Sequence, residues 1–145
     1  MLRVVLDTNV IISSVLHKKG IPSQLMEVWH NRKFQLVTSR KIIEEVIRVI
    51  SEPRLKDAFR IRDERIHRLE KALRKNAILA SGNVNVTGAI PEDPSDEMFL
   101  SAAIVRKANF IVSGDKHLLN LKSYRGVTIL TPRQFLDQLE QEKSS

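Results

Sequence analysis

The sequence contains no cysteine, and this absence excludes disulfides, thiol nucleophiles and thiolate metal sites. A metal ion bound by this chain would therefore need oxygen or imidazole ligands. The four histidines lie in separate segments without metal-ligand spacing, and we assign them no catalytic role. No serine belongs to a readable Ser-His-Asp arrangement either, so a serine hydrolase is unsupported.

Long apolar runs and aromatic side chains are also scarce. No run of about 18 apolar residues is present to span a bilayer, and the opening MLRVVLDTNV has a strand-like pattern instead of that of a signal peptide. We therefore expect a cytoplasmic protein with no membrane partner. Aromatic residues make up 5% of the chain, so platforms on which single-stranded bases stack are not evident.

Charge is plentiful and unevenly distributed. The 145 residues carry a formal net charge of +7, with twelve Lys or Arg against seven Asp or Glu between residues 40 and 76. The segment EDPSDE, residues 92–97, contains four acids and no base. A basic surface attracts the phosphate backbone of nucleic acids, although an ordinary solvated helix face has the same composition.

Strand-like and helical patterns alternate along the chain, which predicts an α/β fold whose parallel sheet is covered by helices on both faces. Length and a 42% apolar content indicate one domain over residues 1–145, with a core at about 3–131 and a C-terminal helix at 132–141. Pro53 should end or bend a helix, and Gly82 should stop the next one. The expected strands lie at 4–6, 34–37, 109–112 and 127–130, and the expected helices before the last lie at 9–16, 21–30, 42–50, 63–80 and 95–107.

Two aspartates come just after strand-like runs. Asp7 directly follows Leu6, and Asp115 follows the run at 109–112 and the pair Ser113-Gly114. In open α/β sheets, ligands bind outside the carboxyl ends of the strands, so both aspartates lie where a site is expected. The alternative is that each one only caps the helix behind it.

Three further acids lie on predicted helices. On a helical projection Asp96 falls in the same arc as Phe99 and Leu100, so its carboxylate should face the core, where a charge needs a partner or a metal ion. Its alternative role is also a helix cap, because negative charge suits the first turn. Glu44 and Glu45 both flank the apolar side of their helix, and periodicity hardly separates either of them from a solvated face.

Three motifs in a fixed order make the pattern recognisable: VVLDTNVIIS, SRKIIEEVIRVI and EDPSDEMFLSAAIVRKANFIVSGDKHLL. Over about residues 3–131 this set resembles the PIN domain family and, within it, the VapC-like toxin branch. The resemblance implies a three-layer α/β/α fold with a four- or five-stranded parallel sheet, and Mg²⁺- or Mn²⁺-dependent cleavage of RNA. It also implies a homodimer and, for a toxin, a cognate antitoxin protein as partner.

Carried over position by position, the resemblance identifies a set of catalytic, metal-binding acids and a set of supporting residues. The acids are Asp7 in LDTN, Glu45 six residues after Ser39, Asp96 in DPSDEMFL, and Asp115 in VSGDKHLL. The supporting residues are Thr8 and Asn9, which hold hydrogen bonds of the site, Ser113 in a small-hydroxyl position, and Asp93 as an extra acid.

Carboxylate ligands select hard cations such as Mg²⁺ or Mn²⁺, and four acids suit one or two ions. With two ions about 4 Å apart, one would lower the pKa of an attacking water and the other would stabilise the leaving 3′ oxygen. The resemblance implies products with 5′-phosphate and 3′-hydroxyl ends. Arg40, Lys41 and Arg48 are candidates to hold single-stranded RNA beside these acids, which would otherwise repel its phosphates.

Other protein classes explain the sequence less well. A haloacid-dehalogenase phosphatase needs a second Asp two residues after the first, where this chain has Asn9, and its late acidic motif is absent because Leu119 stands four residues after Asp115. A receiver domain also matches poorly. An RNA-processing nuclease without an antitoxin fits the same pattern, and so does a non-catalytic nucleic-acid-binding module, although the four retained acids argue against the latter.

Overall fold

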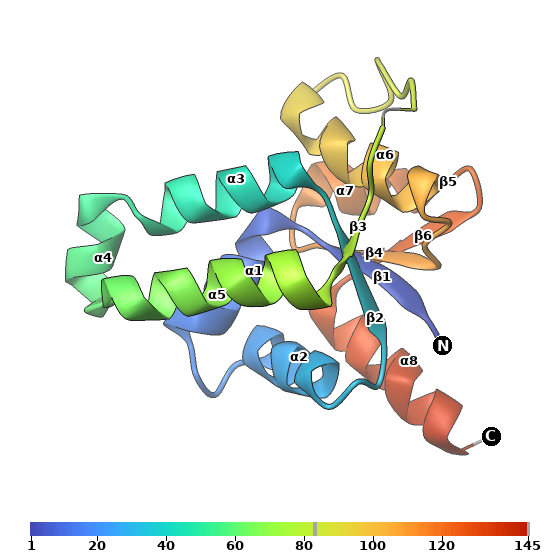
Figure 1. Ribbon diagram of the computed structural model, residues 1–145. Coiled ribbons are helices and arrows are strands. Elements are labelled where there is room, and N and C mark those ends of the chain that lie inside the picture. Colours follow the sequence, from blue (N-terminus) through green and yellow to red (C-terminus); the bar gives the residue numbers. More distant parts are fainter. Residues whose placement is uncertain (83, 145) are drawn as a thin grey trace.

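A six-stranded sheet lies at the centre of the computed structural model, which describes residues 1–82 and 84–144 (Figure 1). The strand order is β3-β2-β1-β4-β6-β5; the first five strands run parallel, and β5 pairs antiparallel with β6. This arrangement confirms the predicted α/β class and its largely parallel sheet. The strands are β1 (Arg3–Leu6), β2 (Gln35–Thr38), β3 (Ile78–Leu79), β4 (Phe110–Val112), β5 (Ser123–Tyr124) and β6 (Val127–Leu130).

Helices cover both faces of the sheet, which gives the three layers. Helix α6 packs on β1, β2 and β4 on one face, while α2 and α8 pack together on the other, and the α3–α4–α5 segment projects beyond the sheet (Figure 1). The helices are α1 (Thr8–Leu16), α2 (Ile21–His30), α3 (Arg40–Ile50), α4 (Pro53–Phe59), α5 (Asp63–Asn76), α6 (Glu97–Val105), α7 (Lys116–Leu121) and α8 (Pro132–Ser144), with a 3₁₀ turn, η1, at Pro94–Asp96.

The core forms where the apolar strands meet the helices. Val4 and Ile111, on the neighbouring strands β1 and β4, are fully buried, as expected for a parallel sheet covered on both faces. The C-terminal helix joins this core through Phe135, whose ring packs edge-to-face on Phe34 with 5.2 Å between ring centroids. Such aromatic pairs contribute about 0.5–1.5 kcal/mol beyond area burial.

Two sequence predictions need correction at the edges of the sheet. The helix expected at 63–80 ends at Asn76, because Ile78 and Leu79 pair with the end of β2 as strand β3, and the Ala80 N–H donates to the Thr38 carbonyl at 2.8 Å. The β5–β6 hairpin was not expected. Its two-residue turn places Arg125 and Gly126 at φ 47° and 86°, the conformation of a tight hairpin turn, although Arg-Gly is a weak signal for one.

Pro53 lies at a helix boundary, as predicted, whereas Pro94 shifts the start of a predicted helix. α3 ends at Ile50, and Pro53 starts the separate helix α4. The helix expected from residue 95 begins instead at Glu97, since Pro94 initiates the 3₁₀ turn that precedes it. Asp96 consequently lies at the junction of η1 and α6.

Candidate metal centre

Parallel pairing of β1 with β4 brings two distant segments to one edge of the sheet. Leu6 pairs with Val112, and the Asp7 N–H donates to the Val112 carbonyl at 3.1 Å. The residues after these two strands, Asp7 on one side and Ser113 to Asp115 on the other, therefore meet at the carboxyl edge. Both aspartates also cap helices: Asp7 accepts from the Val10 N–H at 2.8 Å and Asp115 from the His117 N–H at 2.8 Å. Capping and convergence on one site thus coexist.

Asp7 lies deepest of these acids, with 3% of its surface exposed. Its second carboxylate oxygen accepts a short hydrogen bond from the Ser113 hydroxyl, which in turn accepts from the Asp115 N–H at 2.9 Å. Burial raises the pKa of Asp7 above its ordinary value, and the bonds from Ser113 and Val10 oppose this rise. Ser113 therefore orients Asp7 and ties it to the segment that carries Asp115.

Three carboxylates form the tightest acidic group in the described part of the chain. One oxygen from each of Asp93, Asp96 and Asp115 lies within 4.8 Å of the others. Burial first, then the hydrogen bond and charge of Asp115 and the charges of Asp93 and Asp7, raise the pKa of Asp96 to about 8. The charge of Asp7 thus reaches Asp96, although Asp7 is not one of the three grouped residues.

Asp96 and Asp115 share this site unequally. Burial also opposes ionisation of Asp115, but hydrogen bonds from Asp96 and from the His117 N–H, with the charges of His117 and Lys116, lower its pKa. The pKa values of the two carboxyls are thus shifted in opposite directions, and Asp96 is the member of the pair that favours the protonated form. Asp96 is the N-cap residue of α6 but makes no side-chain cap bond, so a capping role does not account for its position.

Glu45 is attached to the site from α3. The Thr8 hydroxyl, in the residue after Asp7, donates to Glu45 Oε2 at 2.7 Å, and Arg48 lies 3.8 Å from Oε1. Glu44 is instead exposed and paired with Arg40 at 3.1 Å. The structure thus separates two glutamates that helical periodicity left undivided.

The remaining predicted residues differ in their contacts. Asn9 is exposed, and only its backbone N–H acts on Asp7; no side-chain hydrogen bond of Asn9 occurs among residues 1–82 and 84–144. Glu97 was not among the predicted site residues, yet its carboxylate accepts from the N–H groups of Gly88 and Ile90 at 3.0 and 3.2 Å. It holds the loop that leads to Asp93. Its place inside an acidic run gave no signal that would distinguish it.

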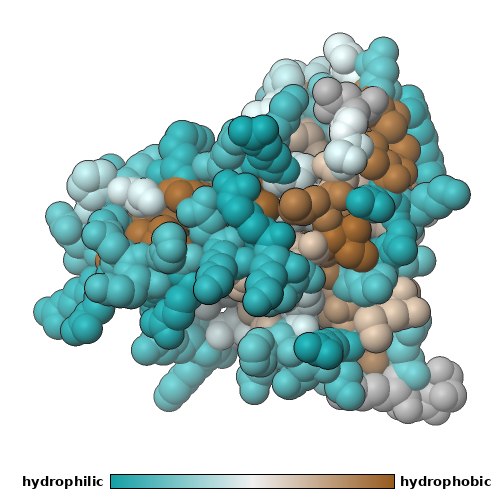
Figure 2. Space-filling view, in the orientation of Figure 1, coloured by the Kyte–Doolittle hydropathy of each residue, from teal (hydrophilic) through white to brown (hydrophobic). Residues whose placement is uncertain are grey.

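A groove of about 1200 Å³ runs beside Glu45, between α3, the segment after β3 and the start of α6. Its lining includes the three predicted RNA-binding residues, Arg40, Lys41 and Arg48. Apolar side chains, among them Leu79 and Met98, form part of the wall. Figure 2 shows apolar surface open to solvent between hydrophilic side chains, in the area where Figure 1 places β3 and α6.

The donor set fits a hard divalent cation. All candidate ligands are carboxylates, and oxygen-only sites suit Mg²⁺ or Mn²⁺ better than softer metals. Asp96 Oδ2 is buried and has no hydrogen-bond partner within the described residues. An oriented, unsatisfied oxygen in a crowd of like charges costs free energy that a bound cation would offset.

A comparison with protein-family models finds a PIN domain at residues 3–117. The chain belongs to the PIN domain family. PIN domains are generally nucleases and generally use divalent metal ions, in agreement with the acidic group. The chain is also similar to an uncharacterized protein of Methanocaldococcus jannaschii, with 26% identity over 147 residues that cover 96% of this chain and 92% of the relative. Within the described residues, no helix of this PIN domain is long and apolar enough to cross a membrane.

Proposed function

We propose that this PIN domain is a Mg²⁺- or Mn²⁺-dependent endoribonuclease that hydrolyses phosphodiester bonds of single-stranded RNA. The observation that carries the proposal is the group formed by Asp93, Asp96 and Asp115, with the unsatisfied Asp96 Oδ2 among them. A purely structural cluster would leave three carboxylates, with one oxygen of each within 4.8 Å of the others, and only the charges of Lys116 and His117 beside Asp115 to offset them. A metal site needs such a cluster.

The acids would act as the metal ligands, with Asp7 and Glu45 at the border of the group. Bound Mg²⁺ or Mn²⁺ supplies Lewis-acid activation of water and neutralises charge on the phosphate. Ser113 holds Asp7, and Thr8 holds Glu45 at 2.7 Å, so both acids are oriented before a substrate arrives. Asp96 must give up its proton to become a ligand, so we expect metal binding to release protons near neutral pH.

Single-stranded RNA is the substrate that suits the surroundings of the acids. Arg40, Lys41 and Arg48 line the groove next to Glu45 and can neutralise backbone phosphates. The apolar wall at Leu79 and Met98 can contact unstacked bases, which only a single strand presents. A duplex keeps its bases stacked inside and would leave this wall uncovered.

Cleavage of an end-labelled single-stranded RNA tests the function. We expect fragments with Mg²⁺ or Mn²⁺, none with excess EDTA, and none from an Asp115→Asn variant with an unchanged circular dichroism spectrum. Asp137→Asn is the matched control, because Asp137 is exposed on α8, outside the site. Cleavage that survives EDTA, or that survives in purified Asp115→Asn, refutes a metal-dependent reaction at these acids.

We further propose a cytoplasmic toxin that acts as a homodimer and is neutralised by an antitoxin. The support is the ordered VapC-like motif set, which ends at SGDKHLL around Asp115. Induced expression should then arrest growth of the host, expression of Asp115→Asn should not, and co-expression of a small neighbouring reading frame should restore growth. Growth that continues despite active enzyme favours an RNA-processing role without an antitoxin.

A further inference from the structure

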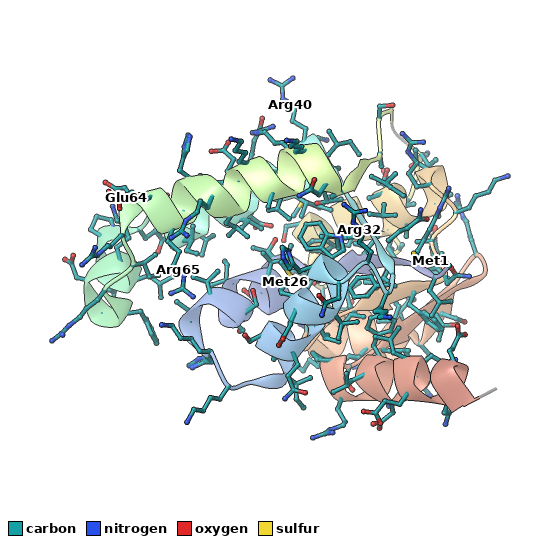
Figure 3. All side chains as sticks on the ribbon, turned by 60° about the horizontal axis from the view of Figure 1, so that its bottom comes forward. Met1, Met26, Arg32, Arg40, Glu64 and Arg65 are labelled. Atoms are coloured by element: carbon teal, nitrogen blue, oxygen red, sulfur yellow. The ribbon has the colours of Figure 1, made fainter. Side chains whose placement is uncertain are left out.

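A basic cavity lies away from the acids, at the corner where α4 meets α5. Its volume is about 340 Å³, and six residues line it: Lys18, Arg60, Arg62, Glu64, Arg65 and Arg68. Five are cations and one is an acid. Figure 3 shows Glu64 and Arg65 at the opposite end of the α3–α5 region from Arg40, which borders the groove beside Glu45.

The positive charge of this cavity is not balanced by the protein. No ion pair within residues 1–82 and 84–144 involves any of its five cations, although Lys56 on α4 and Arg74 on α5 are each paired with an acid. Asp63, which follows Arg62 directly, forms a salt bridge with Lys56, and Arg74 forms one with Glu70 at 3.0 Å. Five cations against one acid leave an excess of four positive charges in one concavity, and like charges repel unless an anion lies between them.

The local backbone adds to this preference for an anion. Arg60 ends α4 with φ 52°, a left-handed conformation uncommon for a residue other than glycine, and the turn brings Arg60 and Arg62 to the same cavity. Arg62 is the N-cap of the 14-residue helix α5 and provides no side-chain cap bond. The positive end of the helix dipole therefore also faces this corner.

The distance between the cavity and the acids matches the length of a short stretch of RNA, so one polymer could occupy both places. Asp7 caps the start of α1, and Lys18 follows His17, the C-cap of the same helix. At 1.5 Å per residue, the two ends of α1 are about 15 Å apart. A stacked strand advances about 3.4 Å per nucleotide, so four or five nucleotides would connect the two places.

We propose that this cavity binds a backbone phosphate of an RNA whose cleaved bond lies at the acid cluster, four or more nucleotides away. The inference rests on the proposed ribonuclease function. It makes length a determinant of substrate choice: short RNAs reach only the groove beside Glu45, whereas longer ones engage both places. The chemistry required of the ligand is a phosphate group, which arginine binds with paired N–H donors.

Two charge-matched double variants on α5 test the proposal. Arg65→Ala/Arg68→Ala removes two cations from the cavity, and Lys71→Ala/Lys75→Ala removes two exposed cations from outside it. For a 20-nucleotide RNA we expect the first to raise KM roughly tenfold with kcat unchanged, and the second to change KM little. Neither should alter cleavage of a trinucleotide. In an Asp115→Asn background, the salt slope of 20-nucleotide RNA binding should fall by about one unit for the cavity variant alone.

The outcomes separate this proposal from the ribonuclease function. If both double variants cleave RNA with equal KM and bind it with equal salt slopes, the RNA-binding role of the cavity is refuted and the proposed ribonuclease function stands. No cleavage by the wild type with Mn²⁺ refutes the nuclease, and RNA binding then tests the cavity by itself. If the cavity variant loses binding of inorganic phosphate but binds RNA as the wild type does, the cavity is a site for free phosphate and not for RNA. Arg65→Lys/Arg68→Lys keeps the charge and should retain RNA binding, which checks that a loss in the alanine variant is not misfolding.

Discussion

The proton on Asp96 predicts an unusual pH dependence of stability in the metal-free protein. Its pKa is about 8 in the folded chain and 3.8 in the unfolded chain, because burial and the neighbouring carboxylates disfavour the charged form. Between these values the folded state binds more protons than the unfolded state, so the free energy of unfolding decreases as pH rises from about 4 to about 8. Asp96→Asn cannot ionise and should lack this part of the decrease.

The size of the effect follows from the environment of the side chain. One pKa unit corresponds to about 1.4 kcal/mol, so the shift sets an upper bound of about 6 kcal/mol. Asp96 is only half-buried, and solvent screening should leave about 1–2 kcal/mol. Asp96→Asn should be more stable than wild type by this amount at pH 8, which for a chain of this size raises its Tm by about 2–8 °C. At pH 4 the wild-type carboxyl is already protonated, and the two proteins should melt together.

Thermal melts at pH 4 and pH 8, with and without Mn²⁺, measure both parts of the prediction. Wild-type protein at 100 times the Kd of Mn²⁺ should gain about 2.7 kcal/mol. Asp96→Asn should gain little from Mn²⁺ and should not cleave RNA, even though it is more stable without the metal. Asp137→Asn, on the far helix α8, should behave as wild type.

A simple helix cap would give a different result. Asparagine caps helices about as well as aspartate, so a capping role predicts equal melts at both pH values. If Asp96→Asn is no more stable than wild type at pH 8, the carboxylates do not repel each other as inferred. If the Tm of Asp96→Asn still rises with Mn²⁺, Asp96 is not a metal ligand.

Three other predictions concern residues around the acids. Glu45→Gln should lower kcat at least tenfold, whereas Glu44→Gln, which changes an exposed neighbour paired with Arg40, should keep kcat; equal effects in a cleavage assay would remove the distinction. Ser113→Ala deletes the donor to Asp7 and should lower the free energy of unfolding by about 1–3 kcal/mol. The loss should be larger at pH 8 than at pH 4, because the substitution raises the pKa of Asp7 further. Urea melts that give the same loss at both pH values would contradict this. Arg40→Ala/Lys41→Ala should reduce the salt slope of RNA binding by one to two units, and an unchanged slope would mean that this side of the groove is only solvated.

The site shows how far local pattern reaches. The sequence predicted two strands that end beside candidate site residues, because buried parallel strands are continuous apolar runs. One is followed by Asp7 and the other by Ser113 and Asp115. Their shared edge was also predictable, since the ligand site of an α/β sheet lies at the carboxyl ends. Asp96 was singled out because a charge on an apolar arc is conspicuous.

Other features depended on contacts between distant segments. Glu45 and Glu44 occupy almost equivalent positions on a helical projection, and only the Thr8 hydroxyl, 37 residues away, distinguishes them. Ala77 continues the helical spacing of Ile66, Leu69 and Leu73, yet the free edge of β2 pairs with Ile78 and Leu79. Tertiary pairing outweighed local propensity there, because an open strand edge offers backbone hydrogen bonds that a helix end lacks.

The sequence by itself determined the α/β class, the positions of the main strands and helices, and the kind of residue that a metal centre would use. The tertiary structure decided which acids approach within 4.8 Å, which of them keeps a proton, and that five cations spread from residue 18 to residue 68 line one cavity. The physical reason is range. Periodicity and capping act over a few residues, whereas a pKa and a binding pocket depend on charges and burial contributed by segments that only the folded chain brings together.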